Sequence, residues 1–220
     1  MIMIESYRDM TIAKYMEIMD ILDEATDETE LVVSLIAALS EQSEDEIERL
    51  PLKEFNKRRI KAIELLKTKP KTDRRIPNKI KIGEKSYRIE KDCFSISAGQ
   101  YIDYRGYLKS VDDLKNNLHR ILSVFIIPEG CEYGEGYDLN EVANEIRDNV
   151  SFELATSLSA FFLAVSQNCI KHILQSLKKE TIRTMARNPK TEKELTEALM
   201  EIQRLNDLVS NGVGLIGQSE

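Results

Sequence analysis

The side chains that most often bind metals or activate nucleophiles are rare in this sequence of 220 residues. Its two histidines, His119 and His172, lie beside the bases Arg120 and Lys171. No His-x-x-x-His, Glu-x-x-His or Gly-x-Ser-x-Gly pattern occurs, so neither histidine has the neighbours that a zinc site or a serine nucleophile needs. We therefore predict no catalytic residue and no metal ligand.

The remaining polar clusters are also expected to be structural. Gly134-Glu135-Gly136 places an acid between two glycines, which repels phosphate, and the sequence has no Gly-x-x-x-x-Gly-Lys-Ser/Thr pattern. Tyr133 and Tyr137 flank this loop, and the loop is expected to pack on its own helix rather than form a binding cage. Two sets of acids could gather around Mg²⁺ or Ca²⁺, but helix capping and solvated loops explain them better: Asp103, Asp112 and Asp113, and Glu132, Glu135 and Asp138. We predict no cofactor.

The composition is that of a folded protein of a reducing compartment. Hydrophobic residues make up 42% and charged residues 31% of the chain, which is enough apolar material for a core. Cys93, Cys131 and Cys169 are odd in number and form no Cys-x-x-Cys pair, which favours reduced thiols in a cytosol. The acidic start of the chain lacks the basic region of a secretory signal, and the apolar-rich run 152–165 is too short and polar to span a bilayer. We expect no membrane partner.

The charge changes sign along the chain, although its total is −7. Residues 1–50 carry fourteen acids and three bases, whereas residues 67–91 carry ten bases and three acids. A basic segment can bind nucleic acid, but Tyr87 is the only aromatic residue in this one, and nucleic-acid modules usually combine bases with several aromatic rings. We favour docking of the segment on the acidic region or on a partner protein. Its candidate contacts are Arg74, Arg75, Lys79 and Lys81.

Repeated helix-start signals predict a mainly helical protein. Capping-box patterns begin at Ser43, Ser97, Ser110 and Thr191, and apolar residues at helical spacing follow each of them. We predict an α+β fold with an N-terminal helical bundle, a basic linker and hairpin, and a C-terminal helical domain built on one long helix. The predicted boundaries are 1–67 for the acidic helical region, 68–78 for the linker, 79–188 for the hairpin and helical core, and 189–220 for a C-terminal helix and tail.

The N-terminal region contains several apolar rows at helical spacing, the first of which starts at Asp9 or Thr11. Pro51 lies where a helix can begin, and the residues before Pro70 and Pro77 are disfavoured in a helix, so residues 68–78 should be extended and exposed. The rows are Ile12, Tyr15, Met16, Met19 and Leu22; Leu31, Leu35, Ala38 and Leu39; Ile47 and Leu50; and Leu52, Phe55, Arg59, Ala62, Ile63 and Leu66.

One strand pair is predicted between the linker and the later helices. Residues 79–82 and 86–89 alternate polar and apolar side chains, and Gly83 begins the turn between them. Because an isolated hairpin is marginally stable, its apolar face should lie on helices. That face comprises Ile80, Ile82, Tyr87 and Ile89. A third short strand is expected near residues 93–96.

Helical spacing resumes at Ser97 and continues to Phe125, before the loop that contains Gly134. A helix over residues 139–147 should then be capped by Asp138 or Asn140. The long helix is expected to begin after Asn149 and to run to about Met185, with two apolar rows. The rows of these helices are Tyr101, Ile102, Tyr104 and Leu108; Leu114, Leu118, Ile121, Leu122 and Phe125; Leu154, Leu158, Phe161 and Val165; and Ala155, Phe162, Cys169 and Ile173.

The last predicted helix spans residues 191–210 and has a heptad-like apolar row. This row comprises Leu195, Leu199, Ile202, Leu205 and Val209. Two heptads are too few for a free coiled coil, so the row either packs on the long helix or binds a partner protein.

Six short segments follow one another along the chain in this order: Asp9–Tyr15, Ser43–Pro51, Ile82–Ile89, Gly99–Asp103, Tyr133–Asp138 and Leu158–Phe162. This order resembles that of the tail assembly chaperone-like proteins of tailed bacteriophages. The resemblance implies a non-enzymatic protein of the host cell cytoplasm that shields hydrophobic helices of a tape-measure-like or other tail protein. Besides a phage structural or tail protein, a second copy of the chain in a homo-oligomer is an expected partner. A structural virion component of the neck, tail or baseplate is the first alternative. A nucleic-acid-binding regulator that uses residues 67–91 is the second.

Overall fold

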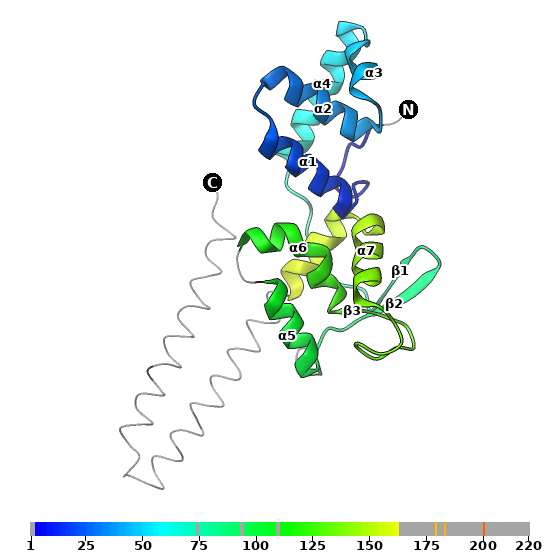
Figure 1. Cartoon of the computed structure of the whole chain (residues 1–220), viewed down its shortest axis with the longest axis vertical. Helices are drawn as coiled ribbons and strands as arrows, with labels where there is room; N and C mark the ends of the chain where they lie inside the picture. Colours follow the sequence, from blue (N-terminus) through cyan, green and yellow to red (C-terminus); the bar gives the residue numbers. More distant parts are fainter. Residues whose placement is uncertain are drawn as a thin grey trace. The chain divides into compact units, whose positions relative to one another are not determined.

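In a computed structural model, the chain folds as helices with a small three-stranded antiparallel sheet beside α6 (Val111–Ser123) and α7 (Leu139–Asn149) (Figure 1). The predicted fold class, mainly helical with a small β element, is confirmed. Residues 1–91 and 95–161 belong to one compact unit, and residues 92–94 and 162–220 to a second. The structure describes residues 3–73, 75–92, 95–108 and 111–162, the side chains of 111–115 excepted, together with Lys179, Arg183 and Met200.

Four helices form the N-terminal part of the first unit: α1 (Ile12–Glu24), α2 (Glu28–Ser40), α3 (Glu44–Glu48) and α4 (Leu52–Lys67). Side chains cap the first three helices, Thr11 at α1, Asp27 at α2 and Ser43 at α3. The predicted capping box is present, because Glu46 N–H donates to Ser43 Oγ over 3.3 Å and Ser43 N–H donates to the Glu46 carboxylate over 2.9 Å. The helix α4 begins directly after Pro51, as predicted.

The core of these helices agrees only in part with the predicted apolar rows. Ile18, which the row of α1 omitted, is fully buried. In α4 the buried residues are Ala62 and Leu65, whereas Leu52 is 73% and Ile63 is 39% exposed. The predicted row of α4 therefore combined one buried residue, Ala62, with two half-buried and three exposed ones. The packing of α4 explains why the predicted row and the buried residues differ. The helix packs on α2, and only a narrow stripe of its surface is covered.

The linker and hairpin follow the prediction closely. Residues 68–73 and 75–78 have no regular structure and are largely exposed, although Ile76 is buried and the Asp73 N–H donates to Ser157 Oγ over 3.0 Å. The strands β1 (Lys79–Ile82) and β2 (Lys85–Ile89) pair in antiparallel register across a turn at Gly83, which has a φ of 58°. Tyr87 is fully buried on the predicted face, and the turn end of the hairpin projects away from the helices (Figure 1).

The third strand lies elsewhere than predicted. The strand β3 (Ile126–Pro128) pairs antiparallel with β2, whereas residues 95 and 96 form a turn and residues 93 and 94 lie outside the described part. Ile126 and Ile127 are both buried, so this strand has no alternation of polar and apolar residues. A short apolar run of this kind is equally compatible with a buried strand and with the end of a helix. For this reason Phe125, directly before the strand, is predicted in the preceding helix.

Three helices follow the hairpin along the chain: α5 (Ala98–Tyr107), α6 (Val111–Ser123) and α7 (Leu139–Asn149). Ser97 and Gln100 form the second predicted capping box, and Asp138 caps α7. The row predicted on α5 is wrong in part, because Tyr104 is buried whereas Tyr101 is 50% and Ile102 is 67% exposed. Since α5 packs on α6, only one side of it is covered. The pattern that begins at Ser110 and the one at Thr191 fall outside the described residues.

A further helix begins at Phe152 and is described as far as residue 162. Of its two predicted rows, Leu158, Ala155 and Phe162 are buried, while Leu154 and Phe161 are half-buried. The predicted continuation to Met185 lies outside the described residues, apart from Lys179 and Arg183, which are helical.

Residues near the start of α1 meet the start of this helix. Thr11 forms a β-bridge with Ser151, and the Phe152 N–H donates to Met10 O over 2.7 Å. The Phe152 ring stacks on Tyr15 with ring centroids 3.5 Å apart and lies 5.6 Å from the Tyr7 ring. This aromatic junction ties α1 to the segment that follows α7.

Candidate protein-binding site

Three of the six exposed large apolar side chains of the described residues lie on α4. Leu52 is 73%, Ile60 is 53% and Ile63 is 39% exposed, and at 3.6 residues per turn these three positions fall on one side of the helix. Ala62 and Leu65 face the core from the other side. Elsewhere in the described chain, large apolar side chains with comparable exposure are Tyr101, Ile102 and Met200.

Bases surround this apolar row. Lys53, Lys57, Arg59 and Lys67 are all exposed, and none of them forms an ion pair with a described residue. Other bases of the same helix do have acidic partners, since Arg58 pairs with Glu54 over 3.2 Å and Lys61 pairs with Glu5. The three apolar residues and the four unpaired bases are called the α4 face below. Sequence reasoning missed it because the row was assigned to the core.

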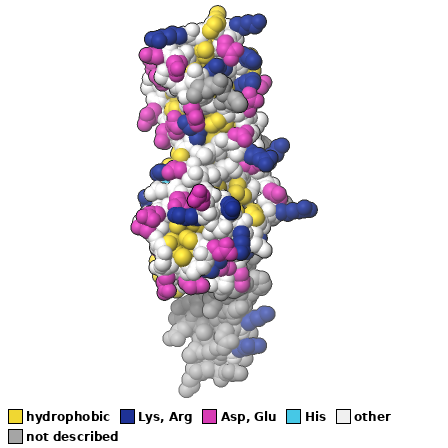
Figure 2. Space-filling model, turned by 90° about the vertical axis from the view of Figure 1, so that its right-hand side faces the viewer, with side chains coloured by type: hydrophobic (Ala, Val, Ile, Leu, Met, Phe, Trp, Pro, Cys, Tyr) yellow, Lys and Arg dark blue, Asp and Glu magenta, His cyan; other side chains and the backbone are white. Residues whose placement is uncertain are grey.

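A groove between α1 and α2 has the opposite charge. It encloses about 470 Å³, and the four apolar residues of its lining, Ile21, Leu31, Ala37 and Ala38, are called its floor below. Five glutamates line it: Glu17, Glu24, Glu30, Glu41 and Glu44. The sequence showed the acidic region, but the pairing of α1 with α2 is what gathers these acids around one floor. On the face drawn in Figure 2, apolar side chains reach the surface among acidic and basic ones.

The basic segment 67–91 is partly neutralised within its own unit. Lys79 pairs with Glu129, Lys85 with Glu145, and Arg88 with Glu132 over 3.4 Å. The hydrogen bond from Lys85 lowers the pKa of Glu145 and raises the pKa of Lys85. These acids come from the loop after β3 and from α7. One prediction had the basic segment dock on the acidic residues 1–50, but within the described residues Lys79, Lys85 and Arg88 pair with these other acids instead.

The four candidate contacts of this segment have different surroundings. Arg75 and Lys81 are exposed and have no acidic partner among the described residues, whereas Lys79 is engaged by Glu129. Arg74 lies outside the described residues. Of these four candidate contacts, two are therefore free within the described residues and one is paired.

Neutralising the hairpin bases should leave the fold intact. We expect Lys79→Ala and Lys81→Ala each to change the free energy of unfolding by less than about 1 kcal/mol, because exposed ion pairs contribute about that much or less. Urea unfolding measures the change, and Lys81→Ala is the matched control because Lys81 has no ion pair. A loss of several kcal/mol in Lys79→Ala alone would show that the contact with Glu129 is a main support of the sheet.

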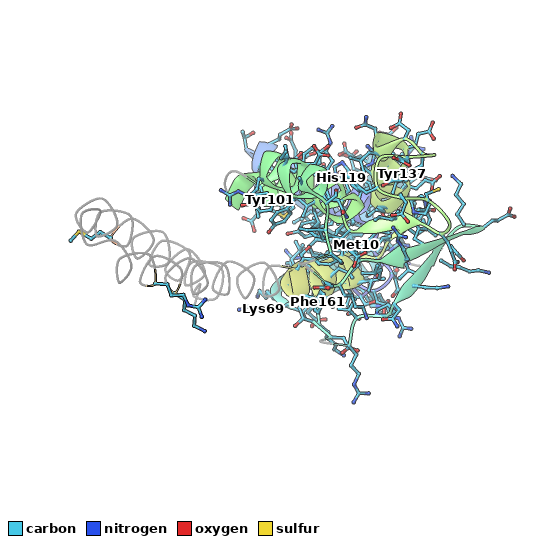
Figure 3. All side chains as sticks on the ribbon, turned by 90° about the horizontal axis from the view of Figure 1, so that it is seen from below. Met10, Lys69, Tyr101, His119, Tyr137 and Phe161 are labelled. Carbon is cyan, nitrogen blue, oxygen red and sulfur yellow. The ribbon has the colours of Figure 1, made fainter. Side chains whose placement is uncertain are left out.

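His119 lies on α6, which packs on α7, and it is 7% exposed (Figure 3). Burial, with the charges of Arg120 and Arg147, lowers the pKa of His119 to about 4. Its Nδ1 atom is buried and has no hydrogen-bond partner. At neutral pH the imidazole is therefore uncharged. Among the described residues, no three His, Cys, Asp or Glu side chains converge as a metal site would require, and His172 lies outside them.

The acids and tyrosines of the loop before α7 have structural contacts. Tyr133 donates a hydrogen bond to Asp103 of α5 over 2.7 Å, and burial together with this bond raises the pKa of Tyr133. Asp138 accepts from the Asn140 N–H over 2.7 Å at the start of α7. Asp103, Tyr133 and Asp138 thus act as a cap and as loop contacts, whereas the side chains of Asp112 and Asp113 lie outside the described part.

The predicted C-terminal contacts also lie outside it, namely Leu195, Leu199, Ile202, Leu205 and Val209. Within the predicted helix 191–210, Met200 is described as helical and 66% exposed. The tail residues Gly212, Gly214 and Gly217 have Gly-x-Gly-x-x-Gly spacing, but a predicted helix precedes them rather than the strand that a dinucleotide site requires.

No protein-family model, no curated protein and no solved structure matches this chain. Among the helices that the structure describes, none has both the length and the apolar character needed to cross a bilayer.

Proposed function

We propose that this protein is a non-enzymatic assembly protein of a tailed bacteriophage, a tail assembly chaperone that binds a tape-measure-like or other tail protein in the host cell cytoplasm. The bacteriophage assignment follows the order of segments between Asp9 and Val165. The protein-binding role is supported by one observation, the exposed apolar row of the α4 face with its unpaired bases.

The chemistry of the α4 face specifies the kind of client. Covering an exposed leucine or isoleucine side chain is worth about 1.5 to 3 kcal/mol, so Leu52, Ile60 and Ile63 favour a partner with an apolar stripe of its own. The flanking lysines and arginine favour acids beside that stripe and disfavour bases. An acidic amphipathic helix has both features, since its apolar side can lie along α4 while its carboxylates reach the bases.

A double substitution on the α4 face tests this proposal. We expect Leu52→Ser with Ile60→Ser to weaken binding of a fluorescein-labelled synthetic helix, with leucines at a and d positions and glutamates on its flanks, by at least about tenfold. Fluorescence anisotropy measures the affinity. Ile102→Ser is the matched control, because Ile102 is 67% exposed but lies on α5, outside the α4 face. This variant should bind the synthetic helix with the affinity of the wild-type protein. Equal weakening in the control, or none in the double variant, would contradict the proposal.

Mass spectrometry of purified particles separates the chaperone from the first alternative, a structural virion component. A chaperone is absent from finished particles, and a neck, tail or baseplate adaptor is present in a fixed number of copies. The second alternative, a nucleic-acid-binding regulator, predicts DNA affinity with a steep salt dependence that is lost in Arg75→Ala with Lys81→Ala. The acidic partners of Lys79, Lys85 and Arg88 favour the protein-binding proposal over this one.

A further inference from the structure

The groove between α1 and α2 complements the α4 face in both charge and apolarity. Glu24, Glu30 and Glu41 are exposed at the groove and form no ion pair with a described residue, whereas Glu17 pairs with Lys14 over 2.6 Å. The floor between them is apolar. The occupant that such a groove fits best is a helix with an apolar row and flanking bases, and the α4 face has this pattern.

We propose that the groove of one copy of the chain binds the α4 face of a second copy. The inference rests on the same α4 face as the proposed function, and adds to it a second surface and a second copy. Glu24, Glu30 and Glu41 form no ion pair within the described chain, and neither do the four bases of the α4 face. Contact between two copies therefore pairs charges that are otherwise unpaired.

The two surfaces also match in length. Leu52 and Ile63 are eleven positions apart (63 minus 52), which is about 16 Å along the axis at 1.5 Å per residue. The part of the chain that lines the groove from Glu30 to Glu41 spans the same eleven positions (41 minus 30) and is nearly all α2. An α4 helix laid along α2 would therefore have its apolar row over the apolar floor for the whole length of the groove.

Contact of this kind is heterologous, because the α4 face and the groove share no residue. Each copy can then offer its α4 face to one neighbour and its groove to another, which produces a ring or an open chain rather than a two-fold dimer. The same contact covers Leu52, Ile60 and Ile63 until an acidic client helix displaces the neighbouring copy. Self-association and client binding would thus exclude each other.

Two charge-reversed full-length variants test the inference. The first carries Lys53→Glu, Lys57→Glu and Arg59→Glu on α4, and the second carries Glu24→Lys, Glu30→Lys and Glu41→Lys at the groove. We expect the wild-type protein to associate with a Kd between about 1 µM and about 1 mM, because one helix face is smaller than a stable interface. Sedimentation velocity should show each variant alone as a monomer, since its groove and its α4 face then have the same sign of charge.

Mixing the two variants should restore association, because the acidic groove of the first meets the basic α4 face of the second, and the reverse. A wild-type protein that stays monomeric at millimolar concentration overturns the inference, as does a mixture in which both folded variants stay monomeric. Association of the groove variant alone would instead indicate pairing of two α4 faces. Circular dichroism verifies folding, and the groove variant, whose α4 is unchanged, should still bind the acidic helix. Loss of client binding with intact self-association would contradict the proposed function and leave this inference standing.

Discussion

Replacing Phe152 with alanine is expected to lower the free energy of unfolding by about 3 to 5 kcal/mol, the range found for buried phenylalanines. Phe152 is 6% exposed, and its ring stacks on Tyr15 and lies beside Tyr7. Its removal leaves a cavity where α1 meets the helix that begins at Phe152. Since typical domains are stable by about 5 to 15 kcal/mol, this loss would be a large share of the total.

Chemical denaturation followed by circular dichroism measures this effect, with Ile102→Ala as the control. Ile102 is 67% exposed, so its truncation should change the free energy of unfolding by about 0.5 kcal/mol or less. If Phe152→Ala is as stable as the control, the aromatic junction does not hold the two segments together. The backbone bond from Phe152 to Met10 O remains in the variant, so the difference reports the ring alone.

Acidification from pH 7.5 to pH 5 is expected to destabilise the protein through His119. The unfolded chain takes up a proton at this residue near its ordinary pKa of 6.5, while the folded protein does so only near about 4. Between these values the unfolded state holds more protons, so stability falls as the pH falls. The full effect, reached below the folded pKa, amounts to at most about 3 kcal/mol. Above pH 7 both states are neutral at His119 and this contribution disappears.

Urea unfolding of the wild-type protein and of His119→Gln at several pH values isolates this contribution. The glutamine variant cannot titrate, so its stability should depend less on pH between about 4 and about 6.5. Identical slopes for the two proteins in this range would contradict the prediction. A direct NMR titration of the imidazole in the folded protein is the complementary measurement, and a midpoint near 6.5 would mean that His119 is solvated.

Local signals in the sequence predicted the features that local chemistry determines. Ser43 with Glu46, and Ser97 with Gln100, satisfy their own helix starts, so their capping boxes depend on few other contacts. The hairpin at Gly83 was predictable for the same reason, because a glycine turn and alternating strands specify its register. The sequence left Asp138 and Asn140 as alternative caps, and the structure shows that Asp138 caps α7.

Features that depend on distant contacts were not predictable in this way. The burial of Ile126 and Ile127 on both sides of β3 removes the alternation that identifies a strand. An apolar residue on α4 looks the same in the sequence whether a neighbouring helix covers it, as for Leu65, or not, as for Ile60. The α4 face could not be predicted for the same reason, because its apolar residues are exposed only as a result of how the other helices pack.

The contact between Thr11 and Ser151 also has a consequence for synthesis on the ribosome. Tyr15 and Phe152 are 137 positions apart (152 minus 15), so at about 5 to 20 residues per second the first ring waits about 7 to 27 s for the second to be made. The N-terminal helices can form early, because their contacts are local, but α1 cannot complete its packing until most of the described chain has been translated. The nascent protein therefore exposes the apolar surface around Tyr7 and Tyr15 until these 137 residues have been translated.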